Sequence, residues 1–335
     1  MTIKPAPPVL ARHLPELRAD LVAWLRDPGP EGGPAIWARG HEPTLANTER
    51  QAADDWARAL SIAELFAVNA PMTRLAVAAG AALPAYRLHP EDLPATHGLL
   101  AWEEPATDPH EGGNLVGAPI VGISWAVHGG GVHIRTWVHR DDWAHYMAQG
   151  DPRAGIRDLT PAETTHIIRT NPAMLVAMSG GYLPFGRIPG WLTSPDDTTD
   201  MSLTELEDLS RSATRQEQAE RALVVTWLLM GQTLSTVEDV RAPRASEKRI
   251  ARIDPNLLGT VRCVQLRHRN AAPVARGEQD VGRAYRHRWI VRGHWRNQYY
   301  ASREEHRPIW IDPHTKGPDG APILDPEKLV NVLRR

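Results

Sequence analysis

The residues of this sequence best suited to chemistry lie near its carboxyl end. The segment RHRWIVRGHWRNQYY (286–300) contains four arginines, two histidines and two tryptophans. Arginine presents paired N–H donors that match phosphate oxygens, and it stays charged at any cellular pH. Alternate side chains of a strand lie about 7 Å apart on one face, close to the phosphate spacing of a nucleic-acid backbone. The segment therefore predicts a phosphate-binding surface formed by Arg286, Arg288, Arg292 and Arg296.

The alternation of this segment also predicts which side of the strand is buried. The odd-numbered residues form one face of the strand, which includes both tryptophans and suits a protein core: His287, Trp289, Val291, Gly293 and Trp295. The even-numbered residues form the opposite face, which carries the arginines: Arg286, Arg288, Ile290, Arg292, His294 and Arg296. Burying unpaired charge is costly, so we expect this second face to be exposed or to meet acidic partners. A shift of one residue in register would exchange the two faces.

A second segment, HRPIWIDPHTKGPDGAP (306–322), places Trp310, Asp312, His314 and Lys316 on one parity. The linker between the segments is long enough to reverse the chain, which predicts a hairpin that brings His294 toward Asp312 and His314. Two imidazoles beside arginine are the groups that metal-free RNA cleavage needs: one takes the 2′-hydroxyl proton, the other protonates the leaving oxygen, and arginine stabilises the phosphorane. The same three side chains are also types that ligate divalent metals, so both chemistries stay open.

Other side chains near these segments extend the predicted surface. Lys316 adds charge, and Tyr299, Tyr300 and Trp310 are candidates for stacking on bases. Several further arginines lie nearby in sequence and would widen the basic patch: Arg262, Arg267, Arg269, Arg283 and Arg303. The alternative interpretation is a solvated or interdomain face that the acidic part of the chain neutralises.

The charges of the chain divide unevenly along its length. Residues 241–310 carry 16 Lys and Arg against 6 Asp and Glu, whereas residues 1–240 carry 18 against 30. Such polarity suits anion binding by the basic part, and it equally suits docking of that part on the acidic half. We therefore expect an acidic part made of helices and a β-hairpin (1–240) and a basic antiparallel β module packed against it (241–335).

The periodicity of apolar residues predicts an α+β fold with a mainly helical N-terminal part and antiparallel β elements. We expect helices at about 11–27, 45–59, 71–83, 141–150 and 213–230, and others after the capping boxes at Ser61, Thr160 and Ser202. We expect strands at 98–102, 120–127, 132–139, 260–268, 286–299 and 307–312, and a long loop over 179–200.

The composition excludes several classes of protein. The single cysteine, Cys263, excludes an intramolecular disulfide and a cysteine-based zinc cage. The N-terminus lacks the apolar core of a signal peptide, and the most apolar stretch (222–231) is about half a membrane span. The sequence also lacks the GxxxxGK[ST], GxGxxG, HExxH and CxxC motifs. We therefore predict a cytoplasmic protein with no membrane partner and no cofactor or metal in its site.

The pair HRWIVRGHWRNQ and RPIWIDPHTKGPDGAP resembles the C-terminal signature of a family of uncharacterised actinobacterial, actinophage and mobile-element proteins. The stretches ELFAVNAPMTRLAVAAGAALP, GLLAW and RALVVTWLLMGQTLSTVEDV are similar to its N-terminal and middle parts, so the resemblance covers most of the chain. The resemblance implies no activity and no catalytic residue for this chain. The link of the family to mobile elements favours a function that involves nucleic acid, by association only. The acids Glu304 and Glu305 argue against phosphate contact by the turn itself.

The leading prediction is a protein that binds the backbone of RNA or DNA through Arg286, Arg288, Arg292, Arg296, Lys316 and Tyr299. The second is a metal-independent ribonuclease-like toxin or phosphodiesterase that uses His294 and His314, with Asp312 beside them. The third is a structural or interaction protein whose basic face contacts a partner or a second copy of the chain.

Overall fold

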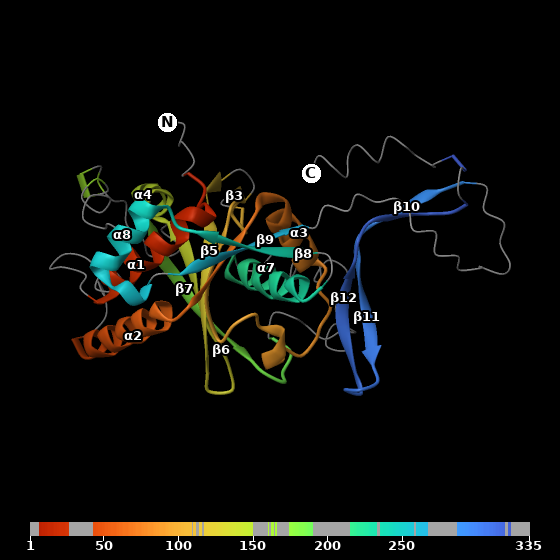
Figure 1. Cartoon of the computed structure of the whole chain (residues 1–335), viewed down its shortest axis with the longest axis horizontal. Helices are drawn as coiled ribbons and strands as arrows, with labels where there is room; N and C mark the ends of the chain where they lie inside the picture. Colours follow the sequence, from red (N-terminus) through yellow and green to blue (C-terminus); the bar gives the residue numbers. More distant parts are fainter. Residues whose placement is uncertain are drawn as a thin grey trace.

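The computed structural model of the chain describes residues 7–26, 43–108, 110–111, 114–115, 117–149, 160, 162–163, 165, 174–189, 215–232, 235–257, 259–266, 287–318 and 321–322. Its centre is a seven-stranded sheet with the strand order β7-β6-β5-β2-β1-β9-β8 (Figure 1). The strands are β1 (Glu64–Val68), β2 (His97–Trp102), β5 (Ile120–His128), β6 (Gly131–His139), β7 (Leu175–Pro184), β8 (Ser235–Arg241) and β9 (Thr260–Leu266).

The sheet is mixed. Strand β1 runs parallel to both of its neighbours, β2 and β9, while the pairs β2–β5, β5–β6, β6–β7 and β8–β9 are antiparallel. A parallel connection needs a crossover, and helix α3 (Ala70–Ala81) supplies it between β1 and β2. Asn69 begins that helix by accepting a hydrogen bond at Oδ1 from the backbone N–H of Met72 (3.1 Å).

Helices cover both faces of the sheet (Figure 1). On one face lie α1 (Leu14–Arg26), which follows the 3₁₀ turn η1 (Ala11–His13), together with α2 (Pro43–Ser61) and α8 (Arg244–Ile253). On the other face lie α3 and α7 (Arg215–Met230). The alternation of β1 fits these layers, because Leu65 and Ala67 pack toward α1 while Phe66 and Val68 pack toward α3.

The core beneath α3 and α7 centres on Trp125, which is 1% exposed. Its ring stacks on Phe66 (5.5 Å between centroids) and meets the edge of Trp227 (5.2 Å). The indole N–H donates to the carbonyl oxygen of Ala95 (2.9 Å), so its polar atom is satisfied. Helix α4 (Arg140–Gln149) adds Trp143 to the same core.

Shorter elements complete the described body. They are η3 (Pro90–Asp92), β3 (His110–Glu111), β4 (Asn114–Leu115) and η6 (Pro255–Leu257). Among the described residues, no helix combines the length and apolarity needed to cross a membrane.

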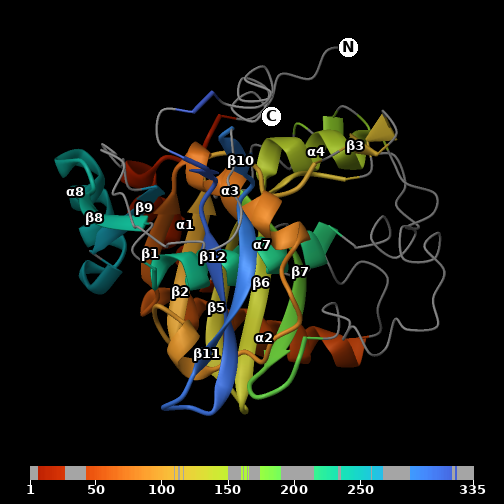
Figure 2. The same ribbon diagram turned by 90° about the vertical axis from the view of Figure 1, so that its right-hand side faces the viewer.

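The C-terminal segments form two further antiparallel pairs. Strands β11 (His294–Tyr300) and β12 (Glu305–Ile311) make a hairpin, and β10 (Trp289–Val291) pairs with β13 (His314–Lys316). Figures 1 and 2 show the β11–β12 hairpin beside the α3 and α7 side of the body, with the β10–β13 pair extending beyond it. We call the β10–β13 pair the arm.

The α+β fold predicted from the sequence is confirmed, with two local corrections. The helix expected after Ser61 is wrong, because residues 64–68 form β1 in the middle of the sheet. The loop expected over 179–200 is wrong at its start, because residues 179–184 belong to β7. The division at residue 240 stays a prediction. Strand β8 spans that boundary, and the same sheet contains β9 beyond it.

Candidate nucleic-acid interface

Two tryptophans hold the β11–β12 hairpin against the body. Trp295 and Trp310 face each other across the strands, and their rings meet edge to face (5.3 Å between centroids). The indole N–H of Trp295 donates to the carbonyl oxygen of Ala79 at the end of α3 (2.8 Å). The backbone N–H of Trp310 donates to Oε1 of Gln232 after α7 (3.2 Å). The prediction that Trp295 lies on the buried side of its strand is therefore confirmed.

Ion pairs hold the far end of the hairpin to the η3 turn. Arg307 pairs with Asp92, whose side chain is 3% exposed, and Arg303 pairs with Glu91. His89 Nε2 lies 3.2 Å from a carboxylate oxygen of Glu305. The hairpin is thus fastened at both ends, so its outer face keeps one orientation relative to the body.

These pairs correct part of the predicted basic patch. Arg303 does not widen the phosphate surface, because Glu91 neutralises it. Arg262 does not widen it either, since it lies in β9 of the sheet and pairs with Glu64 (2.9 Å). The other arginines expected there, with Arg286 of the leading set, lie outside the described residues: Arg267, Arg269, Arg283 and Arg286.

The strand expected over 286–299 is interrupted, which is a second correction. Strand β10 ends at Val291, and β11 begins only at His294. Gly293 lies at the break under the ring of Trp310, where an added Cβ would come within 2.5 Å of Cζ2. The close approach of this ring requires glycine and bends the chain. Trp289 is opposite Lys316 in the arm and half-exposed, so its predicted burial on the same face as Trp295 stays a prediction.

The predicted phosphate-binding cations lie along the outer side of the hairpin and in the arm. Arg292, Arg296 and Lys316 are exposed, and Arg288 is half-exposed. Within the described part of the chain, no carboxylate forms an ion pair with any of them. Arg296 donates from Nη2 to the neutral Oε1 of Gln298 (2.9 Å). No described acid therefore neutralises these side chains at the surface.

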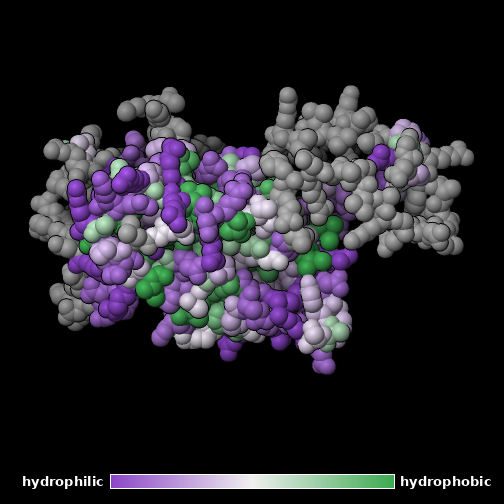
Figure 3. Space-filling view, in the orientation of Figure 1, coloured by the Kyte–Doolittle hydropathy of each residue, from purple (hydrophilic) through white to green (hydrophobic). Residues whose placement is uncertain are grey.

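Hydrophobic side chains lie between the cations on the outer face. By register, Ile309 is the neighbour of Arg296 and Ile311 is the neighbour of His294. Figure 3 shows a hydrophobic area on the hairpin where it approaches the arm. Tyr299 is 50% exposed but lies on the Trp295 side of β11, where its ring is 5.1 Å from that of His306 on the opposite strand. Trp310 is not a stacking platform as expected, because it packs on Trp295 and against the core.

The predicted hairpin brings the two histidine segments together, but it places the histidines on different strand pairs. His294 is opposite Ile311 in the hairpin, and His314 is opposite Val291 in the arm. The Nδ1 atom of His294 lies 3.0 Å from the carbonyl oxygen of Arg292, and that of His314 lies 2.9 Å from the carbonyl oxygen of Asp312. Both rings are exposed. Their action as an acid–base pair stays a prediction.

No group of three or more His, Cys, Asp or Glu side chains placed to hold a metal ion occurs among the described residues. Comparison of the chain with protein-family models, curated proteins and solved structures finds no match. The function proposed below therefore rests on the geometry and charge of the C-terminal segments.

Proposed function

We propose that the protein binds the phosphate backbone of RNA or DNA through the outer face of the β11–β12 hairpin and through the arm. The observation that carries the proposal is the row of exposed guanidinium groups at Arg292 and Arg296, continued by Arg288 and Lys316, with no carboxylate paired to them among the described residues. Exposed guanidinium groups that no carboxylate neutralises bind phosphate oxygens through paired N–H donors.

The remainder of the molecule favours binding at this one surface. Residues 1–240 carry an excess of acidic side chains, which repel a polyanion. The arginines at the docked end of the hairpin are neutralised by Glu91 and Asp92. Among the described residues of the hairpin, Arg303 and Arg307 are therefore weaker competitors for phosphate than the cations of the outer face. As the sequence predicts, we assign this binding to the cytoplasm.

The salt dependence of binding tests the proposal. The double variant Arg292→Ala/Arg296→Ala removes two phosphate contacts, so the slope of log K against log salt should become less steep by about one to two units. The affinity itself should fall at low salt for every sequence tried, since phosphate contacts carry no base preference. Labelled single-stranded RNA and duplex DNA, titrated at several salt concentrations, measure both quantities.

A matched control removes an arginine that already has partners. Arg249 is exposed but binds the carboxylates of Glu16 and Asp20, so Arg249→Ala changes the net charge without removing a free guanidinium. This variant should retain the wild-type slope. If the double variant binds RNA and DNA with the same affinity and slope as the wild type, the proposal fails.

The same RNA titration tests cleavage as the second candidate. His294 and His314 are exposed on either side of the break that contains Arg292, so a strand bound there would pass both imidazoles. RNA cleavage by the wild type that His294→Ala and His314→Ala each abolish would establish the enzyme. RNA that stays intact in every tube leaves binding alone.

A further inference from the structure

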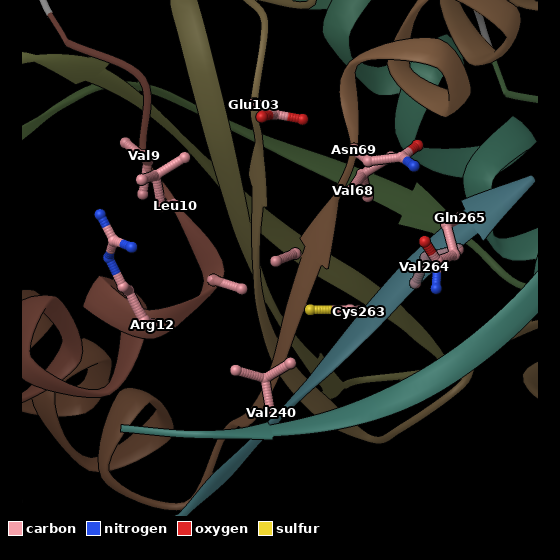
Figure 4. A pocket seen from close by; sticks show the side chains of 12 residues that line it. Val9, Leu10, Arg12, Val68, Asn69, Glu103, Val240, Cys263, Val264 and Gln265 are labelled. Carbon is pink, nitrogen blue, oxygen red and sulfur yellow. The ribbon is translucent and has the colours of Figure 1, made fainter. Parts of the chain in front are cut away.

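A cavity of about 350 Å³ lies far from the hairpin, at the carboxyl ends of the three parallel strands (Figure 4). Asn69 follows β1, Glu103 follows β2, and Gln265 is near the end of β9. The segment that leads into α1, including Leu10, forms the opposite wall. In sheets with parallel strands, this edge is the usual place for ligands, because the chain leaves neighbouring strands there and opens a crevice. The volume falls within the range of small-molecule sites.

The floor of the cavity is apolar. It is formed mainly by Ala67 of β1, Val240 of β8 and the thiol of Cys263 of β9, which share the face of the sheet that α1 covers. Figure 4 shows Glu103, Asn69 and Gln265 along one side of this floor. An apolar floor with a few polar groups at its edge is the composition that orients a small ligand.

The carboxylate of Glu103 has a fixed position. One of its oxygens accepts a hydrogen bond from the backbone N–H of Ala70 at the start of α3 (2.8 Å). A carboxylate held in this way by a helix N-terminus needs no rearrangement to receive a second donor. Glu103 therefore offers a preorganised acceptor at the edge of the cavity.

The charges around the cavity are mainly negative. Cys263 is directly opposite Glu238 in the β8–β9 pair, so both side chains lie on the same face of the sheet. Burial raises the pKa of the Cys263 thiol, and the nearby carboxylates of Glu238 and Asp239 raise that pKa further. The cation among the lining residues is Arg12, which is exposed, donates to His13 Nε2 (3.2 Å) and points away from Cys263 in Figure 4.

We propose that this cavity binds a small molecule that carries a protonated amine on an apolar body. The ammonium group donates to the carboxylate of Glu103, and the apolar body lies on Ala67, Val240 and Cys263. An anion of the same size is repelled by Glu103 and Glu238. This site is separate from the nucleic-acid surface, so either proposal stands if the other fails.

The single cysteine of the chain provides a local reporter, because Cys263 lines the cavity. Three probes share one apolar body and differ in head group: phenethylamine, 2-phenylethanol and phenylacetate. Bound phenethylamine should slow the alkylation of Cys263 by iodoacetamide, measured by mass spectrometry. The concentration that gives half protection should be about tenfold lower for the amine than for the alcohol, since a charged hydrogen bond is worth that much. Phenylacetate should protect least.

Two variants and one control locate the binding. Glu103→Gln keeps an oxygen that can accept from Ala70 N–H but removes the charge, so it should abolish the preference for the amine over the alcohol. Val240→Trp fills the cavity and should abolish protection by both. Glu104→Gln removes the next carboxylate, which pairs with Arg74 outside the cavity, and should leave the preference unchanged.

The comparison of probes on the wild-type chain decides the proposal even if a variant fails to fold. Equal protection by the three head groups, or no protection by the amine at millimolar concentration, overturns it. A preference for the amine that survives in folded Glu103→Gln also overturns it.

Discussion

The arginines of the sheet body and those of the hairpin's outer face have opposite environments. In the body, Arg18 is 5% exposed and donates to the carbonyl oxygens of Ala63 (2.7 Å) and Leu257, where burial lowers its pKa to about 10. On the hairpin, Arg292 and Arg296 are exposed and have no ion pair with a described carboxylate. The same side chain joins distant segments in the first case and presents charge to solvent in the second.

This contrast shows that an arginine-rich composition does not by itself indicate a polyanion-binding protein. The buried guanidinium group of Arg18 donates to backbone carbonyls, and the exposed one of Arg249 pairs with neighbouring acids. The informative cations are those that the fold brings to the surface and leaves unneutralised. The body and the hairpin should therefore respond differently to the removal of a side chain, in the free energy of unfolding and in hydrogen exchange.

The largest effect is expected in the core of the body. Trp125→Ala removes a fully buried ring between Phe66 and Trp227, so it should lower the free energy of unfolding by about 3–5 kcal/mol. Urea denaturation measures this loss. The matched variant Trp289→Ala, in the half-exposed arm, should cost much less. Equal losses would contradict the view that the arm contributes little to the stability of the body.

A smaller effect is expected where the hairpin meets the body. Asp92→Asn leaves Arg307 without its buried partner, which typically costs about 3 kcal/mol. Hydrogen exchange should quicken in β11 and β12 while the central sheet stays protected, because the hairpin undocks first. Glu91→Gln breaks only an exposed pair and should change little. Faster exchange throughout the sheet in Asp92→Asn would show that hairpin and body unfold as one unit.

The smallest effect concerns a buried histidine of the body. His139 is 3% exposed, and burial lowers its pKa, although Asp141 and Asp142 act in the opposite direction. The unfolded chain therefore takes up a proton below about pH 6.5 more readily than the folded chain, and stability falls as the pH falls. The slope from one such group is at most about 1.4 kcal/mol per pH unit.

His139→Asn tests this expectation, since asparagine can still accept from the backbone N–H of Asp141. The free energy of unfolding, measured at pH 7 and pH 5, should differ less in the variant than in the wild type. The carboxylates that also titrate in this range cancel in that comparison. An unchanged difference would mean that the burial of His139 does not govern its titration.

The periodicity of apolar residues predicts most of the long elements of the body. Helices α1, α2, α3 and α7 and the β5–β6 hairpin all lie where apolar spacing predicts them. Strand β1 was missed because a five-residue apolar strand has no period of its own, and Ser61 with Glu64 imitates a capping box. Strand β7 was taken for a loop because of its glycines. Gly181 in fact allows Glu220 of α7 to approach, since a Cβ there would come within 2.6 Å of Oε1.

The candidate interface was predicted only in part, for a similar reason. Alternation along β11 correctly placed Trp295 inward and Arg296 outward. The break at Gly293 depends on the ring of Trp310 in another strand, and the neutralisation of Arg303 depends on Glu91. The cavity beside Cys263 gives no signal in the sequence, because its lining comes from five separate stretches of the chain. Contacts between distant residues are what local patterns cannot supply.

The place of β1 in the sheet has a consequence for how the protein is made. Leu65 pairs with Leu99 on one side and with Val261 on the other, so a ribosome that has produced β1 and β2 must add the whole middle of the chain before β9 emerges. At about 5–20 residues per second, that interval is roughly 8 to 30 s. Throughout it, the unpaired edge of an apolar strand is a template for aggregation. A nascent chain that stops before residue 260 keeps this edge open permanently.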